Sequence, residues 1–153
     1  MAAQLADRAP LATIEHRWDC YAAVAAALLK GREQGYPRLV EAGRLTEDEA
    51  DRRIAIMAAC AEIWRAASAC TLPDPLIAHG HDRSDIVAEL RRARAITAKL
   101  LAREPGNGAA RYRVERIDTM IAWHVRWIEG PLFLVRITLE LRARCAAPER
   151  HAA

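Results

Sequence analysis

The feature that most constrains this chain is a helix-start signal in its first third. Residues 46–49 read TEDE, in which the Thr46 hydroxyl can accept from the Glu49 amide while the Glu49 side chain reaches back. Gly43 stands three residues earlier, at a place where a helix commonly ends in a left-handed glycine. One helix therefore ends and another begins within a few residues. Residues 32–57 predict an antiparallel helical hairpin with a three-residue turn.

The composition agrees with an all-α fold. The 153 residues include 33 alanines, but only 7 glycines, 7 prolines and 1 phenylalanine. Alanine has the highest helix propensity, and small contact residues let helices pack closely. Apolar residues make up 52% of the chain, which is enough to build one sizeable core. We therefore predict a single helical domain.

Apolar residues at spacings of three and four predict a second hairpin after a proline-rich linker. The first hairpin spans 13–70, the linker 71–84 reads TLPDPLIAHGHDRS, and the second hairpin spans 85–129. Pro37 lies inside the first helix and removes a backbone donor, so we expect a kink or a restart there. The two antiparallel hairpins form a four- to five-helix bundle, followed by a tail at 131–153.

The tail leaves two interpretations open. The segment FLVRITLEL, residues 133–141, places apolar residues at alternate positions, which is the period of a strand. A lone strand needs a partner edge, and the rest of the sequence offers no other clear strand. We favour a helix over 132–144, because its composition and neighbours are helical. The alternative is a strand that pairs with a copy of itself or with another protein.

Charge and cysteine usage narrow the function classes. The net charge is +3, with a basic excess confined to residues 81–153, which permits an acidic partner without requiring nucleic acid. The four cysteines share no CxxC spacing. The N-terminus lacks the pattern of a signal peptide, and no apolar run approaches a membrane span. We expect a cytoplasmic protein with reduced thiols and no membrane partner.

Catalytic and cofactor motifs are missing from the sequence. It contains no Gly-x-Ser-x-Gly elbow and no glycine-rich phosphate loop. His79, His81 and Asp82 are metal-ligand residue types, but a structural metal site needs about four placed ligands. A solvated linker is the simpler interpretation, and a metal-dependent hydrolase at His79 and His81 is kept as a third hypothesis. We predict no enzyme, no catalytic residues, no cofactor and no metal.

The first hairpin resembles one in small uncharacterised proteins of tailed phages and prophages, whose motif runs RExxYPRxVxxGRxTxxxAxxxIAxM. The motif positions here are Arg32, Glu33, Tyr36, Pro37, Arg38, Val40, Gly43, Arg44, Thr46, Ala50, Ile54, Ala55 and Met57. The resemblance implies an origin in a phage or mobile element. Small proteins of that origin often bind a host machine, including defence complexes such as CRISPR, and this step is an analogy of origin. Tyr36, Arg38 and Arg44 are the motif positions that folding explains least.

One face of the last helix of the second hairpin is a candidate protein-binding surface. Its core stripe is predicted from Val114, Ile117, Ile121, Val125 and Ile128. Beside that stripe, the helical period gathers Tyr112, Arg116, Trp123 and Trp127, with Met120 between the two stripes. Tyrosine, tryptophan and arginine are the residue types that anchor protein interfaces. The competing interpretation is that this helix is central and both stripes are core.

A basic face on the preceding helix offers an alternative partner. Arg91, Arg92, Lys99 and Arg103 can meet nucleic-acid phosphates. The face lacks the asparagine or glutamine of a base-reading helix, which argues against specific DNA recognition. Solvated surface charge is the simpler interpretation.

We predict a non-enzymatic, phage-type adaptor or inhibitor of a host machine. It would bind a protein partner through Tyr112, Arg116, Trp123 and Trp127, with Tyr36 and Arg38 as further candidates. The sequence leaves open a homodimer as the partner. Nucleic-acid binding through the basic face is the alternative function.

Overall fold

A computed structural model describes residues 9–146 of the chain, and their side chains from residue 18 onward. The helices of this range are α1 (Ala9–Glu41), α2 (Glu47–Ser68), α3 (Pro75–Ala78), α4 (Arg83–Arg103), α5 (Gly108–Arg126) and α6 (Leu132–Ala146). No strand occurs in residues 9–146, so the all-α prediction is confirmed and the segment 132–144 is a helix. The prediction of four to five helices did not include α3, a single turn within the expected linker.

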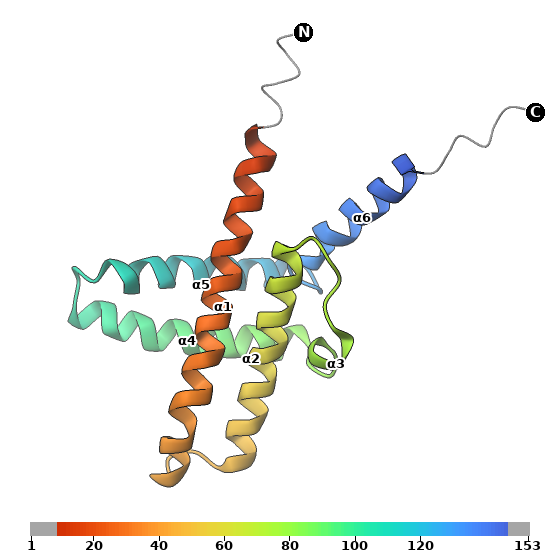
Figure 1. The fold of residues 1–153 in the computed structure, drawn as a ribbon. Coiled ribbons are helices and arrows are strands. Elements are labelled where there is room, and N and C mark those ends of the chain that lie inside the picture. Colours follow the sequence, from red (N-terminus) through yellow and green to blue (C-terminus); the bar gives the residue numbers. More distant parts are fainter. Residues whose placement is uncertain (1–8, 147–153) are drawn as a thin grey trace, which may run out of the picture.

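The helices form two hairpins that cross each other (Figure 1). α1 packs along α2, and α4 packs along α5. α2 also contacts α4, while α1 contacts α5, so the two hairpins are joined face to face. α6 follows α5, contacts α2, and projects from the body of the molecule. Within the described range, no helix combines the length and the apolar character that a membrane span needs.

The turn of the first hairpin is capped at Thr46 and Gly43 as the sequence predicts, but it spans residues 42–46 and is longer than the predicted three residues. The Thr46 hydroxyl accepts from the Glu49 amide at 3.2 Å, and Gly43 adopts a φ of +64°. The Gly43 amide donates to the Val40 carbonyl, which closes the end of α1. The Glu49 carboxylate accepts from Arg53 Nε at 2.7 Å instead of reaching back to Thr46.

The restart expected at Pro37 does not occur, because α1 is one continuous helix through that residue. Pro37 removes one hydrogen bond from the helix. Arg53 of α2 contacts the residues around Pro37. Burial alone would lower the pKa of Arg53, but its side-chain hydrogen bonds to Glu49 and to Tyr36 of α1 raise that pKa. A side-chain hydrogen bond between Arg53 and Tyr36 thus links the last turns of α1 to α2.

The one-turn helix α3 is stabilised at its N-terminal end. The Asp74 side chain accepts from the Leu76 amide at 2.9 Å, and Pro75 occupies a first-turn position that needs no amide donor. The Asp74 amide donates to Glu62 of α2 at 2.8 Å. The linker is thus tied to the body, although Leu76 itself points into solvent.

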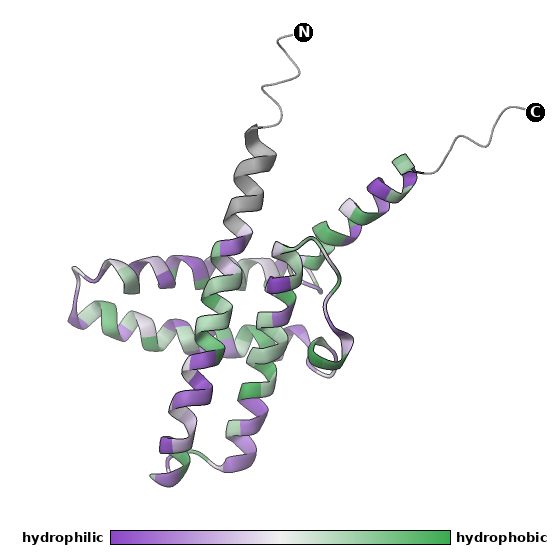
Figure 2. Cartoon of the chain, viewed as in Figure 1, coloured by the Kyte–Doolittle hydropathy of each residue, from purple (hydrophilic) through white to green (hydrophobic). Residues whose placement is uncertain are grey.

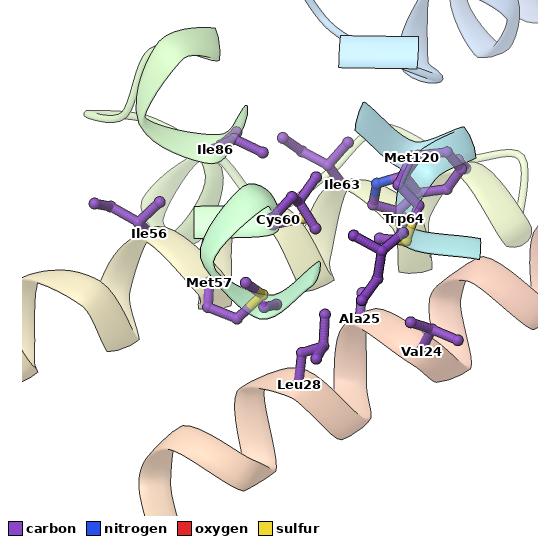
Figure 3. Packing of buried hydrophobic residues seen from close by; sticks show 14 of the residues in the cluster. Val24, Ala25, Leu28, Ile56, Met57, Cys60, Ile63, Trp64, Ile86 and Met120 are labelled. Carbon is purple, nitrogen blue, oxygen red and sulfur yellow. The ribbon is translucent and has the colours of Figure 1, made fainter. Parts of the chain in front are cut away.

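The core is built around α2, which is buried on two sides. Met57 and Trp64 are completely buried, and Figure 3 shows Leu28 of α1 directed toward Met57. Cys60 is buried together with Ile56 and Ile63, so little of α2 beyond its first turns is left to solvent. Burial raises the pKa of the Cys60 thiol to about 12, which keeps this side chain a neutral, inert hydrophobe.

A buried ion pair joins the two hairpins. Arg32 of α1 is 7% exposed and Glu89 of α4 is 0% exposed. Arg32 Nε and Nη2 lie 3.3 and 3.2 Å from Glu89 Oε2, while Arg32 Nη1 donates to the Leu28 carbonyl. Glu89 also accepts from Arg92. No buried side-chain nitrogen or oxygen in the described range lacks a hydrogen-bond partner, so the pair is fully satisfied.

The first prediction concerns this ion pair. Replacing Glu89 with glutamine leaves the Arg32 charge buried without its carboxylate, so the free energy of unfolding should fall by about 3 kcal/mol. Urea denaturation followed by circular dichroism measures the loss. As a control, Arg94→Ala removes the exposed pair with Asp118 and should cost less than about 1 kcal/mol. Equal losses for the two variants would show that the buried pair does not stabilise the crossing.

Candidate protein-binding surface

A cluster of aromatic rings fixes the inner side of α5. The Trp18 ring lies 5.7 Å from the Trp64 ring and 5.4 Å from the Trp123 ring, measured between centroids. The Tyr21 ring also packs against Trp64, with a centroid distance of 5.2 Å. These contacts join α1, α2 and α5 and hold Trp123 half-buried. Trp123 is therefore placed by the core even though part of it reaches the surface.

His124 connects the aromatic cluster to the end of α5. Trp64 Nε1 donates to His124 Nε2 at 3.1 Å, and His124 is almost completely buried. Nε2 can accept only from a neutral imidazole, and burial lowers the pKa of His124 to about 4. His124 is therefore neutral at physiological pH and acts as a structural acceptor.

The chain reverses tightly against His124. Gly130 has a φ of +57°, and a Cβ atom built there would lie 2.6 Å from the His124 imidazole. Only glycine fits this position, because a side chain would both strain the backbone and overlap the ring. The Gly130 amide donates to the Trp127 carbonyl at 2.9 Å, and α6 begins two residues later.

This reversal brings the start of α6 back onto the end of α5. The rings of Trp127 and Phe133 stack with a centroid distance of 4.2 Å and an interplanar angle of 6°. The Arg126 guanidinium lies 5.3 Å from the centroid of the Trp127 ring, within the range of a cation–π contact. The stacked pair is thus ordered by neighbours from two helices.

A groove lies beside the stacked pair. It has a volume of about 320 Å³ and is lined by Thr119, Ala122, Trp123, Arg126 and Trp127. We call these five residues, together with Phe133, the Trp127 surface. A cavity of this volume is at the lower end of those that bind small molecules, and it can also take a large side chain of a partner.

The predicted stripe on α5 divides into two parts. Trp123 and Trp127 line the groove, whereas Tyr112 and Arg116 form a separate pair nearer the start of the helix. The Arg116 guanidinium lies 4.3 Å from the centroid of the Tyr112 ring. A hydrogen bond with Cys20 of α1 raises the pKa of Tyr112. Thr119 lies between the two pairs in the sequence of α5 and belongs to the groove with Trp123 and Trp127.

The structure does not bring Tyr36 and Arg38 to this stripe. Both lie in the last turns of α1, close to its connection with α2 and away from the crossing of α1 and α5 (Figure 1). Tyr36 is half-buried against Arg53, and Arg38 is exposed. These two candidates therefore lie apart from the α5 residues.

The basic face on α4 is exposed but only partly available. Arg91, Lys99 and Arg103 form no ion pair with any described residue. Arg92 donates to the buried Glu89 and so contributes to the crossing of the hairpins. Three cations of the predicted four remain for an anionic partner.

The histidine-containing linker shows no metal-site geometry among the described residues. Asp82 accepts from the Ser84 hydroxyl and from the Asp85 amide, and these hydrogen bonds lower the pKa of Asp82. Asp82 is thus the N-cap of α4, while His79 is exposed. In residues 9–146, no three or more histidine, cysteine, aspartate or glutamate side chains are grouped so that they could hold a metal ion.

The predicted core face of α5 is wrong at the C-terminal end of the helix. Val125 and Ile128 were expected in the core but are 52% and 80% exposed. Met120 and His124 occupy the buried positions instead, and the helix ends at Arg126, before Ile128. The sequence analysis also missed Phe133, Arg126, Ala122 and Thr119 as surface neighbours. The available signal was the Gly130-Pro131 break, which returns the chain to Trp127.

A second prediction tests the tight reversal. Gly130→Ala combines backbone strain with a contact on the imidazole, so it should lower the free energy of unfolding by about 3 kcal/mol. Gly43→Ala is the matched control, because its φ is also positive but a Cβ there meets nothing within 4 Å. The control should cost only the backbone strain, about 1 kcal/mol. Thermal unfolding compares the two, and similar losses would contradict the close approach to His124.

A third prediction concerns pH. The folded-state pKa of His124, about 4, lies below the usual value of 6.5, so the unfolded chain binds more protons between these values. The contribution of neutral His124 to the free energy of unfolding is fully present above pH 6.5. It decreases as the pH drops toward 4, by up to about 3 kcal/mol. His124→Gln should flatten this pH dependence, whereas His79→Gln in the exposed linker should leave it unchanged. Urea unfolding at several pH values measures the slopes, and an unchanged slope in His124→Gln would exclude this histidine as its source.

The comparisons with known proteins identify no relative of this chain. The chain matches no family model, no curated protein and no solved structure. The function is therefore argued from the surface of the molecule itself.

Proposed function

We propose that this chain is a non-enzymatic adaptor or inhibitor that binds another protein through the Trp127 surface. The observation that supports it is the stacked Trp127–Phe133 pair at the edge of an open groove. Tryptophan and arginine dominate the binding energy of protein interfaces, and here Trp123, Trp127 and Arg126 line one groove. Rings that are already ordered lose little conformational entropy when a partner binds.

The charges around the groove indicate the chemistry of the partner. Arg126 lines the groove, Arg116 lies farther along the same helix, and Arg83 donates to the Val125 carbonyl at 3.2 Å. The nearby acidic residues are engaged, since Glu129 pairs with Arg136 and Asp118 pairs with Arg94. A partner that presents a large apolar side chain next to a carboxylate would complement this surface.

The resemblance of the first hairpin to phage and prophage proteins suggests the biological class of the partner. Within this proposal the partner is a component of a host machine, such as a CRISPR defence complex. The hairpin itself supplies the scaffold, because Thr46 and Gly43 of the motif cap its helices. The binding surface lies on α5 and α6, outside the motif.

Nucleic-acid binding is the second candidate. The observation that favours it is the set of three exposed cations on α4, Arg91, Lys99 and Arg103, that pair with no described carboxylate. Binding of this kind would weaken steeply as salt is added, because each phosphate contact releases counterions. It would be insensitive to changes at Trp127.

A fourth prediction separates the two candidates. The wild-type chain and the double variant Trp127→Ala/Phe133→Ala are used to capture partners from bacterial lysate, with and without nuclease, and bound proteins are identified by mass spectrometry. We expect a protein that survives nuclease treatment and whose recovery falls at least about tenfold with the double variant. Leu76→Ala is the control, because Leu76 is 92% exposed in α3, outside the Trp127 surface.

Circular dichroism of each variant verifies that it is folded. A partner retained equally by the double variant would refute binding through the Trp127 surface. A recovery that disappears with nuclease would instead support the basic face of α4.

A further inference from the structure

α6 has two apolar faces: one packs on the core, and the other is exposed apart from the stacking of Phe133 on Trp127. Leu132 and Val135 are buried, and Leu139 packs beside them against the core. The outer face consists of Phe133, Leu134, Ile137 and Leu141, which are 37–55% exposed. At 3.6 residues per turn these four side chains fall on one side of the helix. Figure 2 shows that this projecting helix carries hydrophobic residues along much of its length.

No described residue covers this outer face, since its four apolar side chains stay 37–55% exposed. A continuous apolar face on a projecting helix is typical of an interface with another molecule.

The charges along α6 indicate which molecule. Arg136 and Glu140 lie one turn apart on the same edge of the outer face. In an antiparallel pair of α6 helices whose twofold axis lies midway between these two residues, Arg136 of each copy lies level with Glu140 of the other, so two opposite-charge contacts form around that axis. A parallel arrangement does not bring these two positions to the same level.

The existing contacts of the two residues permit this pairing. Glu140 forms no ion pair with any described residue. Arg136 donates Nε and Nη2 to Glu129 at 2.6 and 2.8 Å, which leaves Nη1 and holds the guanidinium in place. Its side chain is half exposed, so a carboxylate of a second copy can reach it.

We propose that two copies of this chain associate through the outer faces of α6 as an antiparallel pair, with Arg136 of each copy opposite Glu140 of the other. Ile137 lies near the twofold axis, and Phe133 of one copy approaches Leu141 of the other. The proposal does not rest on the function proposed above, because Leu134, Ile137 and Leu141 lie outside the Trp127 surface.

Sedimentation velocity over a range of concentrations gives the first part of the test. The wild-type chain should reach twice the 17.0 kDa mass of one copy. Ile137→Asp places a charge on the axis and should raise the dissociation constant by at least about tenfold, while the helical circular dichroism signal stays unchanged. A wild-type chain that remains monomeric up to its solubility limit would overturn the proposal, as would an unaffected Ile137→Asp dimer.

Charge-reversal variants form the second part of the test and determine how the two α6 helices pair. Arg136→Glu and Glu140→Arg should each weaken the dimer, because each sets like charges opposite one another twice. Mixing the two single variants should restore association, since every contact in the mixed dimer then has opposite charges. Arg91→Glu on α4 is the control and should leave the mass unchanged. A mixture no more dimeric than its components would rule out this antiparallel pairing.

Discussion

The arrangement of this molecule depends on Trp64, which lies at the crossing of the two hairpins and is completely buried. Its ring packs against Trp18 and Tyr21 of α1, and its indole nitrogen donates to His124 of α5. One side chain of α2 therefore sets the distance between three helices. Because His124 must stay neutral to accept that hydrogen bond, the position of α5 is coupled to the protonation of a single imidazole.

A second polar link, between Arg32 and Glu89, joins the hairpins at another point along α1. Apolar contacts alone would allow the hairpins to slide past one another with little loss of buried area, because alanine-rich helix faces are smooth. A buried hydrogen bond or ion pair that is satisfied in only one register removes that freedom. The crossing that carries the Trp127 surface is thus specified at two points and filled with apolar side chains between them.

The structure could be predicted from the sequence where local chemistry decides it. Thr46 and Gly43 mark the turn because capping involves neighbours in the chain, and the helical period identified most of α2 and α4. Prediction from the sequence failed where contacts from elsewhere in the chain matter: α1 continues through Pro37, next to a hydrogen bond between Tyr36 and Arg53 of α2, and Val125 is exposed while His124 occupies the buried position of that turn. Trp123 and Trp127 were identified by their spacing, but Phe133 was not. Its place beside Trp127 depends on a chain reversal that only the approach of Gly130 to His124 determines.

The burial of α2 on two sides separates the part of the chain that maintains the fold from the parts that present a surface. Substitutions in α2 change core volume and are selected against whatever the partner is. Exposed residues such as Ile128, which follows α5, and Leu134 and Ile137 of α6 can change without altering that core. The surface of such a scaffold can therefore vary at a few exposed positions while its fold stays constant.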